Sequence, residues 1–132
     1  METTRRRTTG EFEVTFEPLD ADDEVIGRMK VLKTFTGGLT GTGVGHMLSI
    51  GTSIDNSAGY VAIERITGDL EGRRGGFALQ HCGHLQRGAS SLTVTVVPDS
   101  GTDELLGLRG EFTIENLGAV HHYAFDYGIE PG

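Results

Sequence analysis

The chain has 132 residues and a formal net charge of −8, and 21 of its residues are glycine. This length suits one domain around a single core, and no run approaches the ~20 apolar residues of a membrane helix. The acidic balance lacks the basic footprint of a nucleic-acid-binding protein, and the one cysteine, Cys82, excludes an internal disulfide framework and a cysteine-only zinc site. Abundant glycine disfavours long helices and suits a curved sheet.

Residues 1–10 are polar, include the arginine cluster Arg5–Arg7, and lack the apolar stretch of a secretory signal. We therefore expect a flexible tail over residues 1–10, a single β-barrel domain over residues 11–132, and a cytoplasmic protein.

A first strand is predicted over residues 11–17, where apolar side chains occupy every second position. A second strand is predicted over residues 27–35, and its apolar face also carries Lys33. Lys33 either lies at a bulge or a rim, where it can reach water, or points into a lumen.

The glycine-rich stretch over residues 36–48 is typical of a strongly coiled strand, because no Gly-Lys-Ser/Thr motif and no helical pattern follow it. A fourth strand is predicted over residues 60–66, and it places Glu64 on the same face as Tyr60 and Ala62.

Later segments alternate in the same way. Residues 77–81 place Phe77, Leu79 and His81 on one face, and residues 92–97 form a sixth strand. Further strands are predicted over residues 106–114, facing inward from Leu106, and over residues 120–127, where one face carries His121, Tyr123, Phe125 and Tyr127.

About eight strands with short connections and no confident helix favour an antiparallel meander. Closing such a meander removes its exposed edges. The sequence therefore predicts an all-β, calycin-like fold, a single closed or nearly closed eight-stranded antiparallel β-barrel. Its interior is either filled or holds one small ligand.

Two blocks resemble the signature of a bacterial family of unknown function: YVAIERITGDLEGRRGGFALQH at residues 60–81 and PDSGTDELLGLRG at residues 98–110. The resemblance extends over residues 12–127 and departs at Asp103, where the family usually has a glycine in a turn. The family is similar in fold to plant allene oxide cyclase and dirigent proteins. This implies a small barrel with an apolar lumen that promotes cofactor-independent cyclisation or isomerisation of an apolar organic substrate, as in natural-product biosynthesis.

Polar residues on apolar strand faces are the candidate catalytic groups: Glu64, His81 and Lys33. In a lumen, burial would raise the pKa of Glu64 and make it a general acid or base near neutral pH. Two other interpretations stay open for Glu64, an outer-face position or a structural pair with Lys33. His81 is equally compatible with a hydrogen-bonded core histidine.

The candidate substrate-binding wall consists of Tyr60, Phe77, Leu79, Phe35, His121 and Tyr123. As a lumen wall, the aromatic row at the C-terminus suits a small apolar or aromatic organic molecule. As an outer face, the same row would form a subunit contact, and we expect a homo-oligomer.

No cofactor and no metal are predicted, because adjacent histidines on a strand point to opposite faces and no metal-ligand spacing is present. The alternative functions are a non-catalytic, lipocalin-like carrier or sensor, and a structural interaction module whose core is filled.

Overall fold

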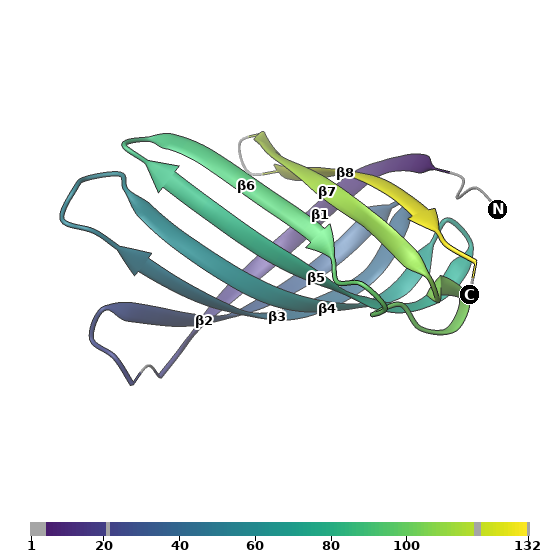
Figure 1. Ribbon diagram of the computed structural model, residues 1–132, viewed down its shortest axis with the longest axis horizontal. Coiled ribbons are helices and arrows are strands. Elements are labelled where there is room, and N and C mark those ends of the chain that lie inside the picture. The colour runs from purple at the N-terminus through teal and green to yellow at the C-terminus, as the bar shows by residue number, and fades with distance from the viewer. Residues whose placement is uncertain (1–4, 21, 118–119, 132) are drawn as a thin grey trace.

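The computed structural model describes residues 5–20, 22–117 and 120–131 of the chain. Within them, eight strands form a closed antiparallel barrel in chain order, as the sequence predicts (Figure 1). The strands are β1 (Arg6–Leu19), β2 (Ile26–Gly37), β3 (Leu39–Gly51), β4 (Ala58–Leu70), β5 (Arg73–Gln86), β6 (Ala89–Val96), β7 (Leu108–Leu117) and β8 (Val120–Ile129). A single 3₁₀ turn, η1 (Asp103–Leu105), precedes β7.

Most strands extend beyond their predicted bounds. β1 begins at Arg6, so residues 6–10, expected in the flexible tail, pair with β8 in a register that matches Arg6 with Tyr127. The predicted inward strand from Leu106 is wrong at its start, because Leu106 is 66% exposed and β7 begins two residues later. Gly107, with φ of +85°, turns the chain between them and interrupts the alternation.

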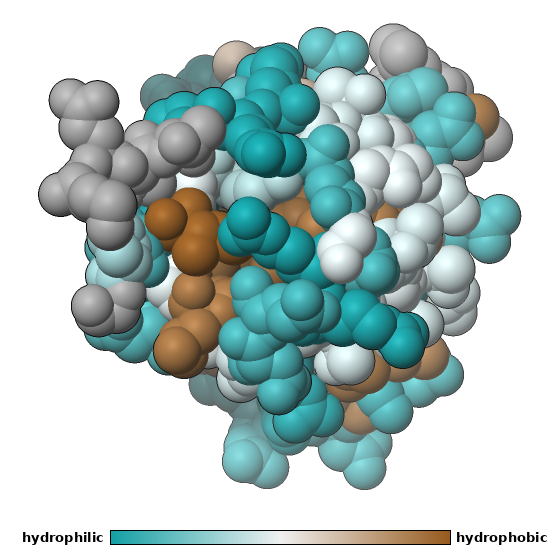
Figure 2. All heavy atoms as spheres, turned by 90° about the vertical axis from the view of Figure 1, so that its right-hand side faces the viewer, coloured by the Kyte–Doolittle hydropathy of each residue, from teal (hydrophilic) through white to brown (hydrophobic). Residues whose placement is uncertain are grey.

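The apolar core fills one half of the barrel, toward the end where the β2–β3 and β4–β5 turns and η1 lie. Leu39 and Leu70 are register partners at this end, and Leu105 of η1 and Leu108 of β7 pack with them without exposure to solvent. Figure 2 looks onto this end, where hydrophilic side chains cover most of the surface and apolar ones show in a few places. Packed side chains therefore close the barrel here.

Two buried tyrosines of β8 form hydrogen bonds to other segments of the chain at this closed end. The Tyr123 hydroxyl accepts a hydrogen bond from the Leu39 amide (2.9 Å) and donates one to the Thr36 carbonyl (2.8 Å). The Tyr127 hydroxyl bonds the Glu71 carboxylate beside the β4–β5 turn. Burial and this carboxylate raise the pKa of Tyr127 to about 12.

The contact between β6 and β7 is the narrowest in the barrel wall. Only Val94 with Phe112 and Thr95 with Glu111 are paired there, among the residues that the structure describes. Every other pair of neighbouring strands is joined by at least seven residue pairs, the number found between β1 and β8. The circle of hydrogen bonds thus closes through a short β6–β7 seam.

No helix in the described parts of the chain is long and apolar enough to cross a membrane.

Candidate functional site

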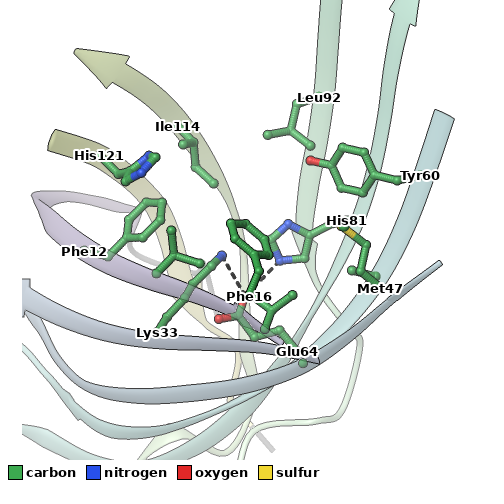
Figure 3. A pocket seen from close by; sticks show the side chains of 14 residues that line it. Phe12, Phe16, Lys33, Met47, Tyr60, Glu64, His81, Leu92, Ile114 and His121 are labelled. Carbon is green, nitrogen blue, oxygen red and sulfur yellow. Dashed lines mark hydrogen bonds and ion pairs between the residues drawn. The ribbon is translucent and has the colours of Figure 1, made fainter. Parts of the chain in front are cut away.

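The other half of the barrel is hollow. A cavity of about 330 Å³ lies toward the β1–β2, β3–β4 and β5–β6 connections, a volume within the range of small-molecule sites (Figure 3). At its outer rim Phe16 and Leu92 are 52% and 41% exposed, so the cavity is reachable from solvent. It is lined by Phe12, Val14, Phe16, Val31, Lys33, Gly45, Met47, Tyr60, Ala62, Glu64, His81, Leu92, Ile114 and His121.

The three predicted catalytic residues come together in this cavity from three strands. Lys33 lies on β2, Glu64 on β4 and His81 on β5, each on an inward-facing position. Lys33 Nζ is 3.2 Å from Glu64 Oε1, and His81 Nε2 is 2.9 Å from the same oxygen. The side chains of Glu64, His81 and Lys33 are only 3%, 7% and 9% exposed.

Glycines of the intervening strand β3 make this meeting sterically possible. Gly43 is the register partner of Lys33, and Gly45 is the partner of Glu64. A Cβ at Gly43 would overlap Glu64 Oε2, and one at Gly45 would lie 2.9 Å from the Ile63 carbonyl oxygen. The glycine-rich sequence of β3 thus leaves the space that the carboxylate occupies.

The electrostatics of Glu64 differ from the sequence-based expectation. Burial raises the pKa of Glu64, but the hydrogen bond from His81 and the charge of Lys33 outweigh it and hold the pKa below its ordinary value of 4.5. The predicted raised pKa is therefore wrong, because burial was considered without these partners. Glu64 is ionised at neutral pH and is not itself poised to exchange a proton there.

The ionised carboxylate determines how the histidine is protonated. A carboxylate only accepts hydrogen bonds, so His81 Nε2 carries the proton of that bond. In the neutral ring, Nδ1 is then an unprotonated acceptor. Figure 3 shows this second nitrogen directed away from Glu64, toward the side of the cavity where Tyr60 and Leu92 lie.

Lys33 presents a cation to the cavity. Its ammonium group lies 4.8 Å from the centroid of the Phe12 ring and 6.0 Å from that of Phe35, both favourable for a cation and an aromatic face. Only one of its three N–H groups is used by Glu64. The remaining donors are available to a ligand.

One oxygen in the site has no partner. Glu64 Oε2 is buried without a hydrogen bond from any residue that the structure describes. Such an orphaned acceptor is costly to bury, and functional sites are where such groups are found. The carboxylate is thus held by one oxygen only.

Two aromatic residues flank the charged group from opposite walls. Tyr60 lies across Gly83, where any Cβ would overlap its ring, and burial raises the pKa of its phenol, which stays protonated as a donor. His121 stacks on Phe12 with ring centroids 5.1 Å apart. Both line the cavity, as expected for substrate-binding positions.

Four predicted wall residues lie elsewhere. Phe35, Phe77, Leu79 and Tyr123 are at most 3% exposed in the packed core and do not line the cavity. Phe77 stacks on Phe125 there, and Tyr123 closes the barrel end. Wall residues that the prediction missed are Phe12, Val14, Phe16, Val31, Gly45, Met47, Ala62, Leu92 and Ile114.

Within the described ranges, no group of three or more His, Cys, Asp and Glu side chains is placed to hold a metal ion. The polar groups of the chain in this apolar cavity are an ion pair, imidazole rings and a phenol.

The family model described as "Protein of unknown function (DUF3224)" matches residues 8–127. A crystal structure of a protein of unknown function from this family, from Shewanella oneidensis MR-1, is similar to the chain with a TM-score of 0.92 and 42% sequence identity. The match covers 99% of this chain and 100% of that one. No curated protein matches the chain.

Proposed function

Because the chain belongs to the DUF3224 family, whose description assigns no function, we propose one from the cavity itself. The protein is a small-molecule-binding barrel that promotes a cofactor-independent isomerisation or intramolecular cyclisation of an apolar organic substrate. The observation that carries this proposal is the Glu64 oxygen shared by His81 and Lys33 at the inner wall of an apolar, solvent-reachable cavity. Buried ionisable groups with perturbed pKa values in a cavity are typical of reactive sites.

In the proposed reaction His81 is the general base. Its Nδ1 takes a proton from a carbon of the bound substrate, and Glu64 stabilises the imidazolium through the Nε2–H bond. Lys33 stabilises negative charge that develops on the substrate. The imidazolium then returns the proton, either to a different carbon, which isomerises the substrate, or to the product of an internal ring closure.

The apolar walls supply the rest of the catalysis. A confined substrate is held in few conformations, and positioning of this kind contributes up to ~7–11 kcal/mol in well-oriented cases. The resemblance to allene oxide cyclase and dirigent proteins supports this part of the proposal, since such barrels act on reactive, flexible molecules. It also supports a role in natural-product biosynthesis.

The test follows deuterium uptake. Apolar candidate substrates are incubated with the protein in D₂O, and both new isomers and deuterium on carbon are measured by mass spectrometry. His81→Gln should slow the uptake by about 10²–10⁴-fold, the usual contribution of a general base. The matched control is His122→Gln, because His122 lies on the outer face of β8 and should leave uptake unchanged. Equal uptake by wild type and His81→Gln would refute the proposed base.

The alternative function is a non-catalytic carrier or sensor. The observation in its favour is that the cavity is mostly apolar and reachable from solvent, which suffices for binding. A carrier predicts that bound compounds are recovered chemically unchanged and without deuterium. A structural module with a filled interior is not favoured, because the half of the barrel opposite the packed core holds the cavity.

A further inference from the structure

We infer that the ligand of this cavity is a neutral carbonyl compound with an apolar body. Its oxygen accepts hydrogen bonds from Lys33, and the carbon next to the carbonyl lies against His81 Nδ1. This inference rests on the proposed function and names the substrate class that the same site takes.

The charge of the site favours a neutral ligand. Lys33 and Glu64 form a buried pair whose charges cancel. A carboxylate ligand would bring a second buried negative charge beside Glu64, and like charges at this distance repel each other. A carbonyl oxygen accepts a hydrogen bond from the ammonium group without changing the charge of the cavity.

The hydrogen-bonding groups favour an acceptor next to an acidic C–H bond. Lys33 offers donors only, whereas His81 Nδ1 offers an acceptor. Because both side chains meet the same Glu64 oxygen, the donor and the acceptor lie on neighbouring sides of it. A carbonyl group satisfies Lys33, and the same polarisation acidifies the adjacent C–H bond that His81 faces.

The side chains of the cavity wall determine which apolar group of the ligand can fit. Phe12, Phe16 and Tyr60 offer aromatic faces, and Leu92 and Ile114 complete an aliphatic side. An aryl or branched hydrocarbon group fits this lining, because no charged side chain other than the Lys33–Glu64 pair lines the cavity among the described residues.

Three probes with the same skeleton test the inference: 4-phenylbutan-2-one, 4-phenylbutan-2-ol and 4-phenylbutanoate. Their affinities for the full chain are measured at pH 7 by titration calorimetry or ligand-observed NMR. We expect the ketone to bind at least about tenfold more tightly than the acid and the alcohol, and Lys33→Met to remove about tenfold of the ketone affinity. Lys30→Met, on the outer side of the same strand, is the matched control.

If Lys33→Met alone does not fold, Lys33→Met/Glu64→Gln replaces it, because this pair of changes leaves no buried carboxylate without its cation. Tighter binding of the acid or the alcohol, equal or unmeasurable binding of all three probes, or full ketone affinity without Lys33 would overturn the inference. A ketone preference without deuterium uptake next to the carbonyl supports the ligand class and refutes the proposed catalysis. Uptake that does not depend on Lys33 refutes the ligand class alone.

Discussion

Replacing Glu64 with Gln separates the electrostatic contribution of the buried ion pair from its packing. The substitution keeps the shape of the side chain but leaves the ammonium group of Lys33, a side chain that is only 9% exposed, without a counter-charge. Removing one partner of a buried pair costs about 3–5 kcal/mol. For a chain of this size, such a loss lowers the melting temperature by roughly 10–20 °C. Urea unfolding followed by circular dichroism and tyrosine fluorescence measures it, since the chain has no tryptophan.

The double variant Lys33→Met/Glu64→Gln completes the cycle. It removes the uncompensated charge while the amide oxygen of Gln still accepts from His81, so it should recover at least about 2 kcal/mol relative to Glu64→Gln alone. Additive losses, with the double variant less stable than Glu64→Gln, would refute the reasoning.

The same cycle has a pH signature. Because the folded-state pKa of Glu64 is below 4.5, its ionisation stabilises the protein above about pH 4.5, and this stabilisation is lost as the pH falls through the folded-state value. The difference in unfolding free energy between wild type and Glu64→Gln should therefore shrink in acid. A difference that stays constant from pH 7 to pH 3 would contradict the assignment.

Three further changes test the steric and polar features of the barrel. Gly43→Ala should displace the buried carboxylate and cost about 1–3 kcal/mol of unfolding free energy, whereas Gly51→Ala on the same strand, with open space at its Cβ, should be neutral in the same urea titration. Tyr123→Phe leaves the buried Leu39 amide without its partner and should cost about 1–3 kcal/mol by chemical unfolding, and an unchanged midpoint would contradict that role. Tyr127 should ionise at about pH 12 in an absorbance titration. Because its pKa is raised in the folded state, the protonated phenol stabilises the fold below pH 10.0, and this stabilisation is lost as the pH rises toward 12. Tyr127→Phe should therefore weaken the decline of unfolding free energy in alkali.

Alternation could predict the fold and place the catalytic candidates on apolar strand faces, but it left open whether Glu64 and Lys33 point into the lumen. A period of two residues places Lys33, Glu64 and His81 on the faces of their apolar neighbours, and each faces the interior. Their convergence could not be predicted, because it depends on the register that aligns β2, β3, β4 and β5 around the barrel. That register also determined the pKa of Glu64, since it supplies the two groups that stabilise its charge.

The sequence also did not reveal how far along the barrel axis each inward-facing residue lies. Phe77 and Leu79 share a face with His81, yet they lie nearer the packed end of β5, where the core is filled. Phe16 shares a face with Phe12 in the same way but lies at the rim of the cavity. Alternation distinguishes inside from outside and carries no information on which inside positions are packed and which line an empty space.

The short β6–β7 seam is the place where the fewest backbone hydrogen bonds hold the barrel closed. Beyond the two paired positions, the backbone edges of Leu92 on β6 and Ile114 on β7 have no ladder partner across the seam, and both side chains line the cavity. Thermal opening begins where the fewest hydrogen bonds must break. We therefore expect the barrel wall to open first along this seam, beside the cavity, while the packed end stays folded. Amide exchange should be faster along this line than anywhere else in the barrel wall.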